Sequence, residues 1–284
     1  MVENFNEKAD SIWSIADLLR GDYKQSEYQK VILPMTVLRR LDCVTNPNKE
    51  NVLERYEQLQ DQGIENVAPA LKKASGEKVY NTSEYTFESL CDDPDQIASN
   101  LQYYINSFDE ETKEIFEKFE FDHHIQRLHD VDLLYKVVKR FTQPEVDLHP
   151  DRVGNSTMGD IFEELIRRFN ESLDENPGEH FTPREVVDLM AELAIEPDRD
   201  DFEENEILQI YDPCCGTGGM LTVSKDHILN SINEEADIYL YGQELNSATY
   251  AICKADMLIK NEDPNNIKGG EKDHSQASVL SNDQ

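Results

Sequence analysis

A glycine-rich turn that directly follows a short apolar run constrains the fold of this chain more than any other feature. The turn lies in the stretch ILQIYDPCCGTGGML, residues 207–221. The apolar run at 207–211 predicts a buried parallel strand, and the residues from Gly219 onward predict the start of a helix. A strand that ends at a carboxylate and turns through glycines into a helix typically binds a nucleotide-like ligand. The alternative is a strand-turn-helix corner without a ligand.

The spacing of the glycines favours one class of nucleotide-like ligand over another. Glycines let the backbone approach a ligand closely, and a helix start offers N–H groups and partial positive charge to an anionic group. A dinucleotide site follows the pattern G-x-G-x-x-G. After Gly216 and Gly218, the third glycine of that pattern would be residue 221, which is Leu221. The spacing therefore argues against NAD.

A second strand is expected at residues 238–241, and it leads to Glu244. An acidic residue at the end of the second strand of such a sheet can accept hydrogen bonds from both ribose hydroxyls. Helices are expected at 220–232 and, capped by Asn246, through Leu258. The alternation of strand and helix predicts a parallel α/β sheet. We expect a loop at 268–272 and the start of a third strand at 277–280.

The segment GEHFTPREVVDLM, residues 178–190, is the second informative stretch. Thr182 is expected to be the N-cap of a helix, with Pro183 at the first helical position and Glu185 completing a capping box. Capping explains Thr182 and Pro183. It does not explain the residues at 178–181 that precede them.

The first half of the chain reads as helical. Apolar stripes recur at helical spacing between residues 10 and 44, and Pro34 is expected to kink or interrupt the second of these helices. Arg39 and Arg40 lie beside the apolar face, where they either pack within a bundle or contact DNA. A polar, proline-bounded link at 144–151 separates a helical domain at 1–150 from a second domain at 151–284.

Cysteine and histidine usage argues against a metal site. The chain has five cysteines and no CxxC pair, which fits a reducing compartment and excludes a disulfide framework. His123, His124 and His129 lie near aspartates but do not repeat at the i, i+4 spacing of a helical zinc site. We therefore predict no metal.

The formal net charge of −32 limits how this chain can use nucleic acid. Proteins that bind DNA unaided usually present a basic face, so either another subunit supplies that surface or nucleic acid is not the partner. A third explanation is a solvated acidic surface in a salt-adapted organism. No apolar run approaches the length of a membrane span, and the N-terminus lacks a signal pattern, so we expect a cytoplasmic protein without a membrane partner.

Four segments resemble known proteins. Asp212, Pro213 and the Gly216-Thr217-Gly218 turn resemble motif I of the S-adenosylmethionine-dependent methyltransferases, whose loop wraps the methionine part of the cofactor. The segment at 178–184 is similar to motif X of the amino-methyltransferases of DNA, which closes over the same end of the cofactor. GDYKQSEYQKVILPMTVLRRLD (21–42) and MGDIFEELIRRFNE (158–171) resemble the modification (M) subunits of type I restriction-modification systems. The resemblance extends from about residue 13 to residue 284.

The resemblance implies a fold, an activity and a site. The fold would be α/β: a helical N-terminal domain followed by an incomplete Rossmann-like S-adenosylmethionine-dependent methyltransferase domain. The reaction would be methyl transfer to adenine N6 in DNA. The helix after Thr182 would place its N-terminus near the methionine carboxylate. Cofactor-binding residues would be Glu179, His180, Phe181, Thr182, Pro183, Arg184, Asp212, Gly216, Thr217, Gly218, Gly219 and Glu244.

The family also implies partners and a catalytic motif. DNA would be bound through a complex with the specificity subunit, the restriction subunit and a second M subunit. The chemistry of such enzymes depends on an Asn/Asp-Pro-Pro-Tyr/Phe motif that holds a flipped adenine, and the chain contains no Pro-Pro pair. We therefore expect these 284 residues alone to bind cofactor without transferring a methyl group. Ser278 is the nearest match to a family residue that contacts the adenine ring.

The absence of that motif has a structural consequence. The strand that bears it would pair beside the strand at 207–211, which would otherwise present an open apolar edge. A sticky, oligomeric or partner-stabilised fragment is expected. Two further interpretations stay open: a methyltransferase that acts on RNA or protein, and a truncated, non-catalytic module that binds the specificity subunit.

Overall fold

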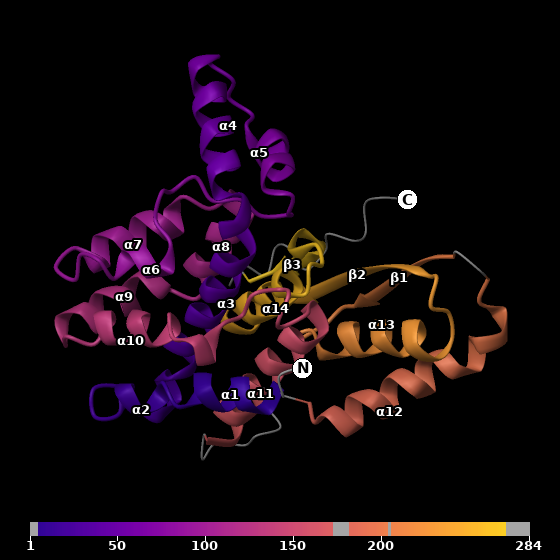
Figure 1. The fold of residues 1–284 in the computed structure, drawn as a ribbon. Coiled ribbons are helices and arrows are strands. Elements are labelled where there is room, and N and C mark those ends of the chain that lie inside the picture. Colours follow the sequence, from indigo (N-terminus) through magenta and orange to yellow (C-terminus); the bar gives the residue numbers. More distant parts are fainter. Residues whose placement is uncertain (1–4, 173–181, 204–205, 271–284) are drawn as a thin grey trace. The chain divides into compact units, whose positions relative to one another are not determined.

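The computed structural model describes residues 5–172, 182–203 and 206–270 (Figure 1). The chain divides into two compact units. We call Met1–Ser172 with Ile259–Asn261 the helical unit, and Leu173–Leu258 with Glu262–Gln284 the sheet unit.

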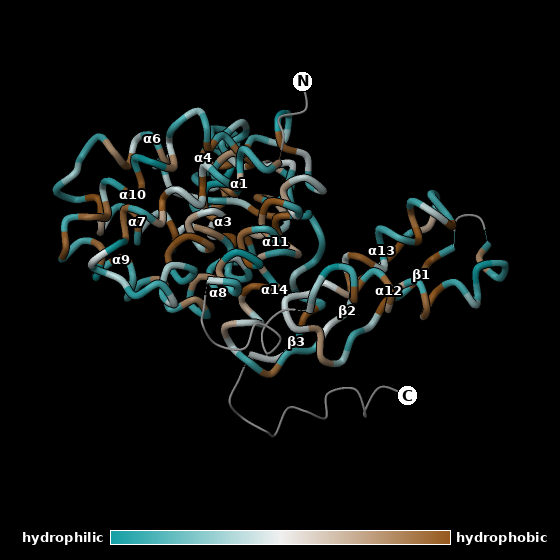
Figure 2. The backbone as a smooth tube through the Cα atoms, turned by 90° about the horizontal axis from the view of Figure 1, so that it is seen from below, coloured by the Kyte–Doolittle hydropathy of each residue, from teal (hydrophilic) through white to brown (hydrophobic). Residues whose placement is uncertain are grey.

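The helical unit is organised around α3 (Gln29–Thr45), whose residues are buried along most of its length. Helices α1, α9, α10 and α11 all pack against it. Figure 2 shows hydrophilic and hydrophobic segments alternating along these helices, as expected where one face of each helix is buried. The other elements are α1 (Phe5–Trp13), α2 (Ala16–Leu19), η1 (Gln25–Glu27), η2 (Asn46–Asn48), α4 (Lys49–Asp61), α5 (Ala68–Ser75), α6 (Phe87–Leu90), α7 (Ile97–Asn106), α8 (Glu110–Lys118), α9 (Phe121–Asp130), α10 (Leu134–Phe141), η3 (Pro144–Val146) and α11 (Asn155–Ser172).

Helix α3 differs from the sequence prediction at Pro34. The helix continues through Pro34 without interruption. Proline removes one backbone donor from a helix and disfavours the helical interior. Here the residues on both sides of Pro34 are buried against neighbouring helices, so tertiary packing compensates for the missing hydrogen bond.

The two arginines of α3 are structural. Arg40 is fully buried, and its guanidinium donates to the backbone oxygens of Leu148 and Val153 and to Asn155 Oδ1. Arg39 is also buried and pairs with Asp42 at 2.8 Å. Packing within the bundle, rather than contact with DNA, therefore accounts for both side chains. Through Leu148, Arg40 also anchors the polar link at 144–151 to the helical bundle.

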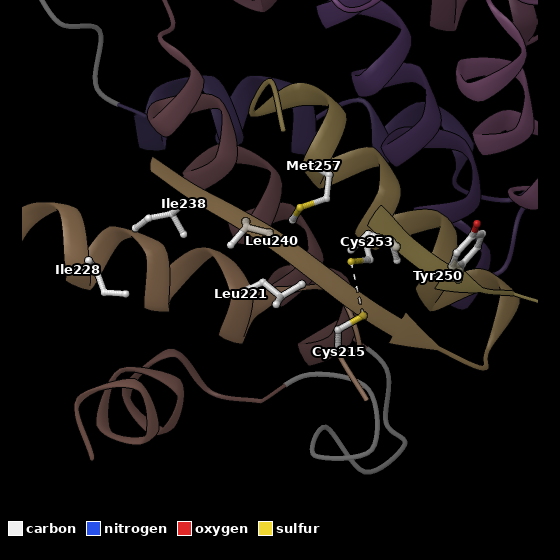
Figure 3. Close-up of a cluster of buried hydrophobic side chains, with 9 residues drawn as sticks. Cys215, Leu221, Ile228, Ile238, Leu240, Tyr250, Cys253 and Met257 are labelled. Carbon is white, nitrogen blue, oxygen red and sulfur yellow. Dashed lines mark hydrogen bonds between the residues drawn. The ribbon is translucent and has the colours of Figure 1, made fainter. Parts of the chain in front are cut away.

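The sheet unit contains a parallel three-stranded sheet in the order β1-β2-β3. Ile207 pairs with Asp237, and Gly242 pairs with Ile267. One face of the sheet packs on a cluster formed by α13 and α14 side chains (Figure 3). The elements are α12 (Arg184–Ile195), η5 (Glu196–Asp201), β1 (Ile207–Asp212), α13 (Gly219–Ser231), β2 (Asp237–Glu244), α14 (Ser247–Ile259, its last residue lying in the helical unit), η6 (Pro264–Asn266) and β3 (Ile267–Gly269).

Two expectations about the sheet are wrong. β1 is parallel, as predicted, but it is not buried: Ile207 is 69% exposed and Tyr211 is 45% exposed. The reason is that, among the described residues, β1 pairs only with β2 and helices cover only one face. Residues 268 and 269 belong to β3 (Ile267–Gly269), although a loop was expected at 268–272. The third strand predicted at 277–280 lies outside the described residues.

Candidate functional site

The loop between β1 and α13 begins at Asp212, the last residue of β1. Its carboxylate Oδ1 accepts a hydrogen bond from the Cys214 N–H at 2.9 Å. Farther along, the Gly218 N–H donates to the Cys215 backbone oxygen at 2.8 Å. Asp212 therefore shapes the entry to the loop with one oxygen, and this leaves its other oxygen uninvolved in that contact.

Two glycines of this loop adopt backbone conformations that side chains disfavour. Gly216 has φ 57° and Gly218 has φ 92°. A Cβ atom at Gly218 would lie 3.0 Å from Cys253 Sγ. Cys215 in the same loop also faces Cys253 in α14 (Figure 3), and their sulfur atoms are 3.8 Å apart. The loop thus lies directly on α14, and only glycine fits at 218.

Helix α13 begins at Gly219, so the loop ends at a helix N-terminus. The first N–H groups of a helix have no partner within it, and the helix dipole places partial positive charge there. A Cβ atom added at Gly219 would meet nothing within 4 Å. This end of α13 is therefore open and suits a ligand group with negative charge or lone pairs.

Glu244, the last residue of β2, lies against this loop. Its Oε2 accepts the Gly216 N–H at 3.1 Å, and its Oε1 accepts the Asn246 N–H at 2.6 Å. The neighbouring Gln243 backbone oxygen accepts the Cys215 N–H at 2.9 Å. The structure therefore brings together Asp212, the glycine turn and Glu244 at the carboxyl edge of the sheet.

The segment before α12 is only partly described. Glu179, His180 and Phe181 lie outside the described residues. Thr182 and Pro183 are exposed, and the N-cap of α12 is Pro183, without a side-chain cap. The prediction of Thr182 as N-cap is wrong by one residue. Since proline has no N–H, it cannot take part in a capping box, and the first turn instead bonds to the Pro183 backbone oxygen.

Arg184 lies in a different environment from the glycine turn. Its Nε contacts Asp188 Oδ1 at 3.3 Å. Both residues line a cavity of about 250 Å³ between α12 and α13, together with Glu192, Asp226 and His227. None of the loop residues from Asp212 to Gly219 lines this cavity. The role of Arg184 at the methionine end of the cofactor stays a prediction.

Sequence reasoning missed two residues that shape the loop. Gln243 fixes Cys215 through its backbone, and Cys253 limits the space at Gly218 through its side chain. The position of Gln243 directly before Glu244 was an available signal, because neighbouring parallel strands place their ends together. Cys253 had no signal, since it lies thirty-eight residues after Cys215 on a helix.

No group of three or more His, Cys, Asp and Glu side chains positioned for a metal ion was found in the described residues. None of the five cysteines, all of which lie in the described ranges, forms a disulfide, and Cys215 is buried whereas Cys214 is exposed. Within the described ranges, no helix has the length and apolar character needed to cross a membrane.

Comparison with protein families divides the chain in two. Residues 8–141 match the HsdM N-terminal domain, and residues 153–283 match the N-6 DNA Methylase family. The two matches leave only a short segment between them, residues 142–152, which includes the whole link at 144–151.

Individual relatives agree with the family matches. The type I restriction enzyme MjaIX methylase subunit of Methanocaldococcus jannaschii is 22% identical over 271 residues, covering 88% of this chain and 45% of the relative. The MpnII methylase subunit of Mycoplasma pneumoniae is 30% identical, covering 37% of this chain and 18% of the relative. A crystal structure of a type I restriction-modification methyltransferase subunit from Streptococcus thermophilus has the same fold, with a TM-score of 0.65 and 18% identity, covering 94% of this chain and 59% of that one. The chain thus spans less than half of these curated relatives.

Proposed function

Because this chain belongs to the methylase subunits of type I restriction-modification systems, we propose that the complete protein transfers a methyl group from S-adenosylmethionine to adenine N6 in DNA. The methyl donor binds at the β1–α13 loop. When bound, it supplies an electrophilic methyl group on a sulfonium centre. The residues of this chain bind and orient it.

The proposed roles follow from position. Asp212 and the backbone from Gly216 to Gly219 surround the methionine part of the cofactor, and Glu244 accepts hydrogen bonds from the ribose hydroxyls. The segment from Glu179 to Arg184 closes the methionine end. The open N-terminus of α13 adds N–H groups directed toward the ligand.

A single contact supports this proposal most strongly, the hydrogen bond from the Gly216 N–H to Glu244 Oε2 at 3.1 Å. It joins the two segments that the sequence assigns to adjacent parts of one cofactor, the methionine part and the ribose. Gly216 and Glu244 are twenty-eight residues apart in sequence. Their proximity is expected of a binding site at the carboxyl edge of a parallel sheet.

The proposed protein partners are inferred from the net charge of the chain and from its family. A chain with a net charge of −32 is unsuited to bind DNA phosphates unaided. We therefore propose that a specificity subunit supplies most of the DNA contacts, with a second methylase subunit and a restriction subunit in the same complex. The assembly acts in the cytoplasm.

The 284 residues alone are proposed to bind the cofactor without transferring its methyl group. They contain no Pro-Pro pair and hence no Asn/Asp-Pro-Pro-Tyr/Phe motif. Such a motif positions the adenine amino group. Without it, the acceptor nitrogen has no site beside the methyl group.

Radiolabel transfer tests the proposed function. The complete gene product, co-expressed with its specificity subunit, is incubated with methyl-labelled S-adenosylmethionine and with duplex DNA, RNA or protein in separate reactions. We expect label on adenine N6 in DNA, and none with the 284-residue chain. Label only in RNA or protein, or transfer by the 284-residue chain alone, would contradict the proposal.

A further inference from the structure

The contact between Glu244 and the β1–α13 loop is made by protein atoms alone. Its Oε2 accepts the Gly216 N–H, and the adjacent Gln243 oxygen accepts the Cys215 N–H. Two successive loop amides are therefore bonded to two successive residues of β2. The conformation of the loop depends on the end of a neighbouring strand and on one side chain there.

The loop has a physical need for such a contact. Gly216 and Gly218 both have positive φ, and glycine loses more conformational freedom on folding than any other residue. A hydrogen bond from a backbone N–H to a carboxylate is stronger than one to a neutral acceptor. The bond to Glu244 is thus suited to restrict Gly216 to one conformation.

The carboxylate is itself fixed from two sides. Its Oε1 accepts the Asn246 N–H at 2.6 Å, and the Asn246 side chain accepts the Ala248 N–H at the start of α14. The Glu244 backbone oxygen accepts the Gly270 N–H at 2.9 Å. A Cβ atom at Gly269 would lie 1.8 Å from that same oxygen, so only glycine lets β3 approach so closely. Glu244 therefore connects the loop, β3 and α14.

The carboxylate keeps capacity for a ligand. An ionised carboxylate has about four acceptor positions on its two oxygens. The two backbone bonds use one position on each oxygen. One further position on each oxygen suits the two adjacent hydroxyls of a ribose.

We propose that Glu244 is a positioning residue as well as a ligand-binding residue: its carboxylate holds the glycine loop in its binding conformation before the cofactor arrives. The binding part of this inference rests on the proposed function. The loop-positioning part concerns the free protein, so it can be tested separately.

Amide hydrogen exchange, measured by NMR on the full chain without ligand, tests loop positioning. Glu244→Gln preserves the shape of the side chain but replaces one oxygen with an NH₂ group and removes the charge. We expect amide exchange at Gly216 to become about tenfold faster, because the hydrogen bond from the Gly216 N–H to a charged carboxylate is lost. Asp263→Asn is the matched control: Asp263 accepts the Asn265 N–H at 2.9 Å on the sheet unit but does not contact the loop.

Glu244→Asp adds a second measurement that a folding defect in Glu244→Gln would not obscure. The aspartate keeps the charge but is shorter by one methylene, so it cannot reach the amides of Gly216 and Asn246 equally well. Gly216 should therefore exchange at a rate between those of the parent protein and Glu244→Gln. Unchanged exchange at Gly216 in both variants, with circular dichroism like that of the parent protein, would overturn the inference.

A pair of ligands separates positioning from ribose contact. S-adenosylhomocysteine and its 2′,3′-dideoxy analogue are titrated into the parent protein and into Glu244→Gln. We expect weaker binding of both, by about tenfold for the dideoxy analogue and more for the parent ligand. Unchanged affinity for the dideoxy analogue would show that Glu244 acts on the ribose alone. If the folded parent protein binds neither ligand, the proposed function fails, and hydrogen exchange still decides the positioning role.

Discussion

The helical unit and the sheet unit differ in how completely they bury their own residues. In the helical unit, a buried carboxylate finds several partners inside the unit: Asp42 accepts hydrogen bonds from Arg39, the Phe87 N–H and Tyr104. In the sheet unit, large apolar side chains remain exposed on α12, on the outer face of β1 and β2, and after β2. These are Val186, Leu189, Met190, Leu193, Ile207, Tyr211, Tyr239 and Leu245.

The difference in burial indicates different roles for the two units, one in stability and the other in binding. The described residues of the helical unit form a core in which the charges of Arg40 and Asp42 have fixed partners, which is how buried charges are retained. The described residues of the sheet unit leave one sheet face and the β1 edge available. Exposed apolar surface of this kind marks an interaction site or an aggregation hazard. This contrast supports the proposal that the helical unit is a scaffold and that the sheet unit binds the cofactor and docks further partners.

The largest expected effect comes from Arg40 in the helical unit. Arg40→Ala would leave the backbone oxygens of Leu148 and Val153 buried without their donor. Each such loss destabilises by about 1–3 kcal/mol, so we expect a total of about 2–6 kcal/mol. Thermal and urea denaturation measure it. Arg20→Ala is the matched control, because its pair with Asp17 is exposed and should contribute under about 1 kcal/mol.

If Arg40→Ala lowers the free energy of unfolding by less than about 1 kcal/mol, the account of the helical unit is contradicted. It would mean that the link between residues 144 and 155 is not held by this arginine. The distinction between the two units would then rest on apolar burial alone.

The next effect is in the sheet unit, at Gly218. Gly218→Ala introduces a Cβ atom 3.0 Å from Cys253 Sγ at a residue with φ 92°. We expect a destabilisation of about 1–3 kcal/mol and loss of cofactor binding. Gly219→Ala serves as the control for stability, since its Cβ atom would meet nothing within 4 Å. Equal stability of the two variants would show that the loop does not lie on α14 as described.

Lys49 gives a pH-dependent effect that should appear only in the helical unit. Burial lowers the pKa of Lys49 to about 8, from 10.5. Because the folded pKa is lower than the unfolded one, Lys49 destabilises the fold fully below pH 8, and this effect fades as the pH rises toward 10.5. We expect Lys49→Met to stabilise the protein by about 1–2 kcal/mol at pH 7, with a smaller gain at pH 9.5.

Denaturation of both proteins across this pH range measures the effect. The gain is limited by the loss of the contact between the Lys49 ammonium and the Tyr104 ring, which lie 5.4 Å apart. A benefit that stays constant from pH 7 to 9.5 would contradict the assigned pKa. Lys30→Met, on an exposed residue of the same unit, is the control for replacing a lysine by methionine at the surface.

The smallest effect on stability is expected on the open face of the sheet. Ile207→Lys should change stability by about 0.5 kcal/mol or less, because Ile207 is 69% exposed. It should also reduce self-association in light scattering at high concentration, since a charge on an edge strand opposes pairing. Leu240→Lys, on the buried face, is the control that should unfold the sheet unit. A monodisperse monomer before any substitution would contradict the expected stickiness.

Local patterns in the sequence were sufficient to predict much of the fold. Hydrophobic periodicity predicted α13, and the Asn246 cap predicted α14, whose Ala248 and Thr249 amides bond to the Asn246 side chain. Tertiary effects were not predictable in this way. Pro34 lies within an intact helix because packing around it outweighs its local preference. The domain boundary at residue 150 stays a prediction, since the compact units divide after Ser172.

The candidate site was predictable to a similar degree. The glycine turn and Glu244 were found from spacing, because strand ends of a parallel sheet meet at one edge. The contact between Gly216 and Glu244 depends on side-chain direction, and the close approach of Cys253 to Gly218 depends on helix packing. Neither is encoded in a local pattern. The cofactor-binding roles of all these residues stay predictions, and Glu179 to Phe181 and Ser278 also lie outside the described ranges.

The central claim is that the loop after β1 and the end of β2 bind S-adenosylmethionine together. Calorimetric titration of the purified chain with S-adenosylmethionine, beside Asp212→Ala and Glu244→Ala variants, tests it most directly. We predict binding to the parent chain that both substitutions weaken by at least about tenfold. No binding by a folded chain, or binding that neither substitution alters, would contradict the claim.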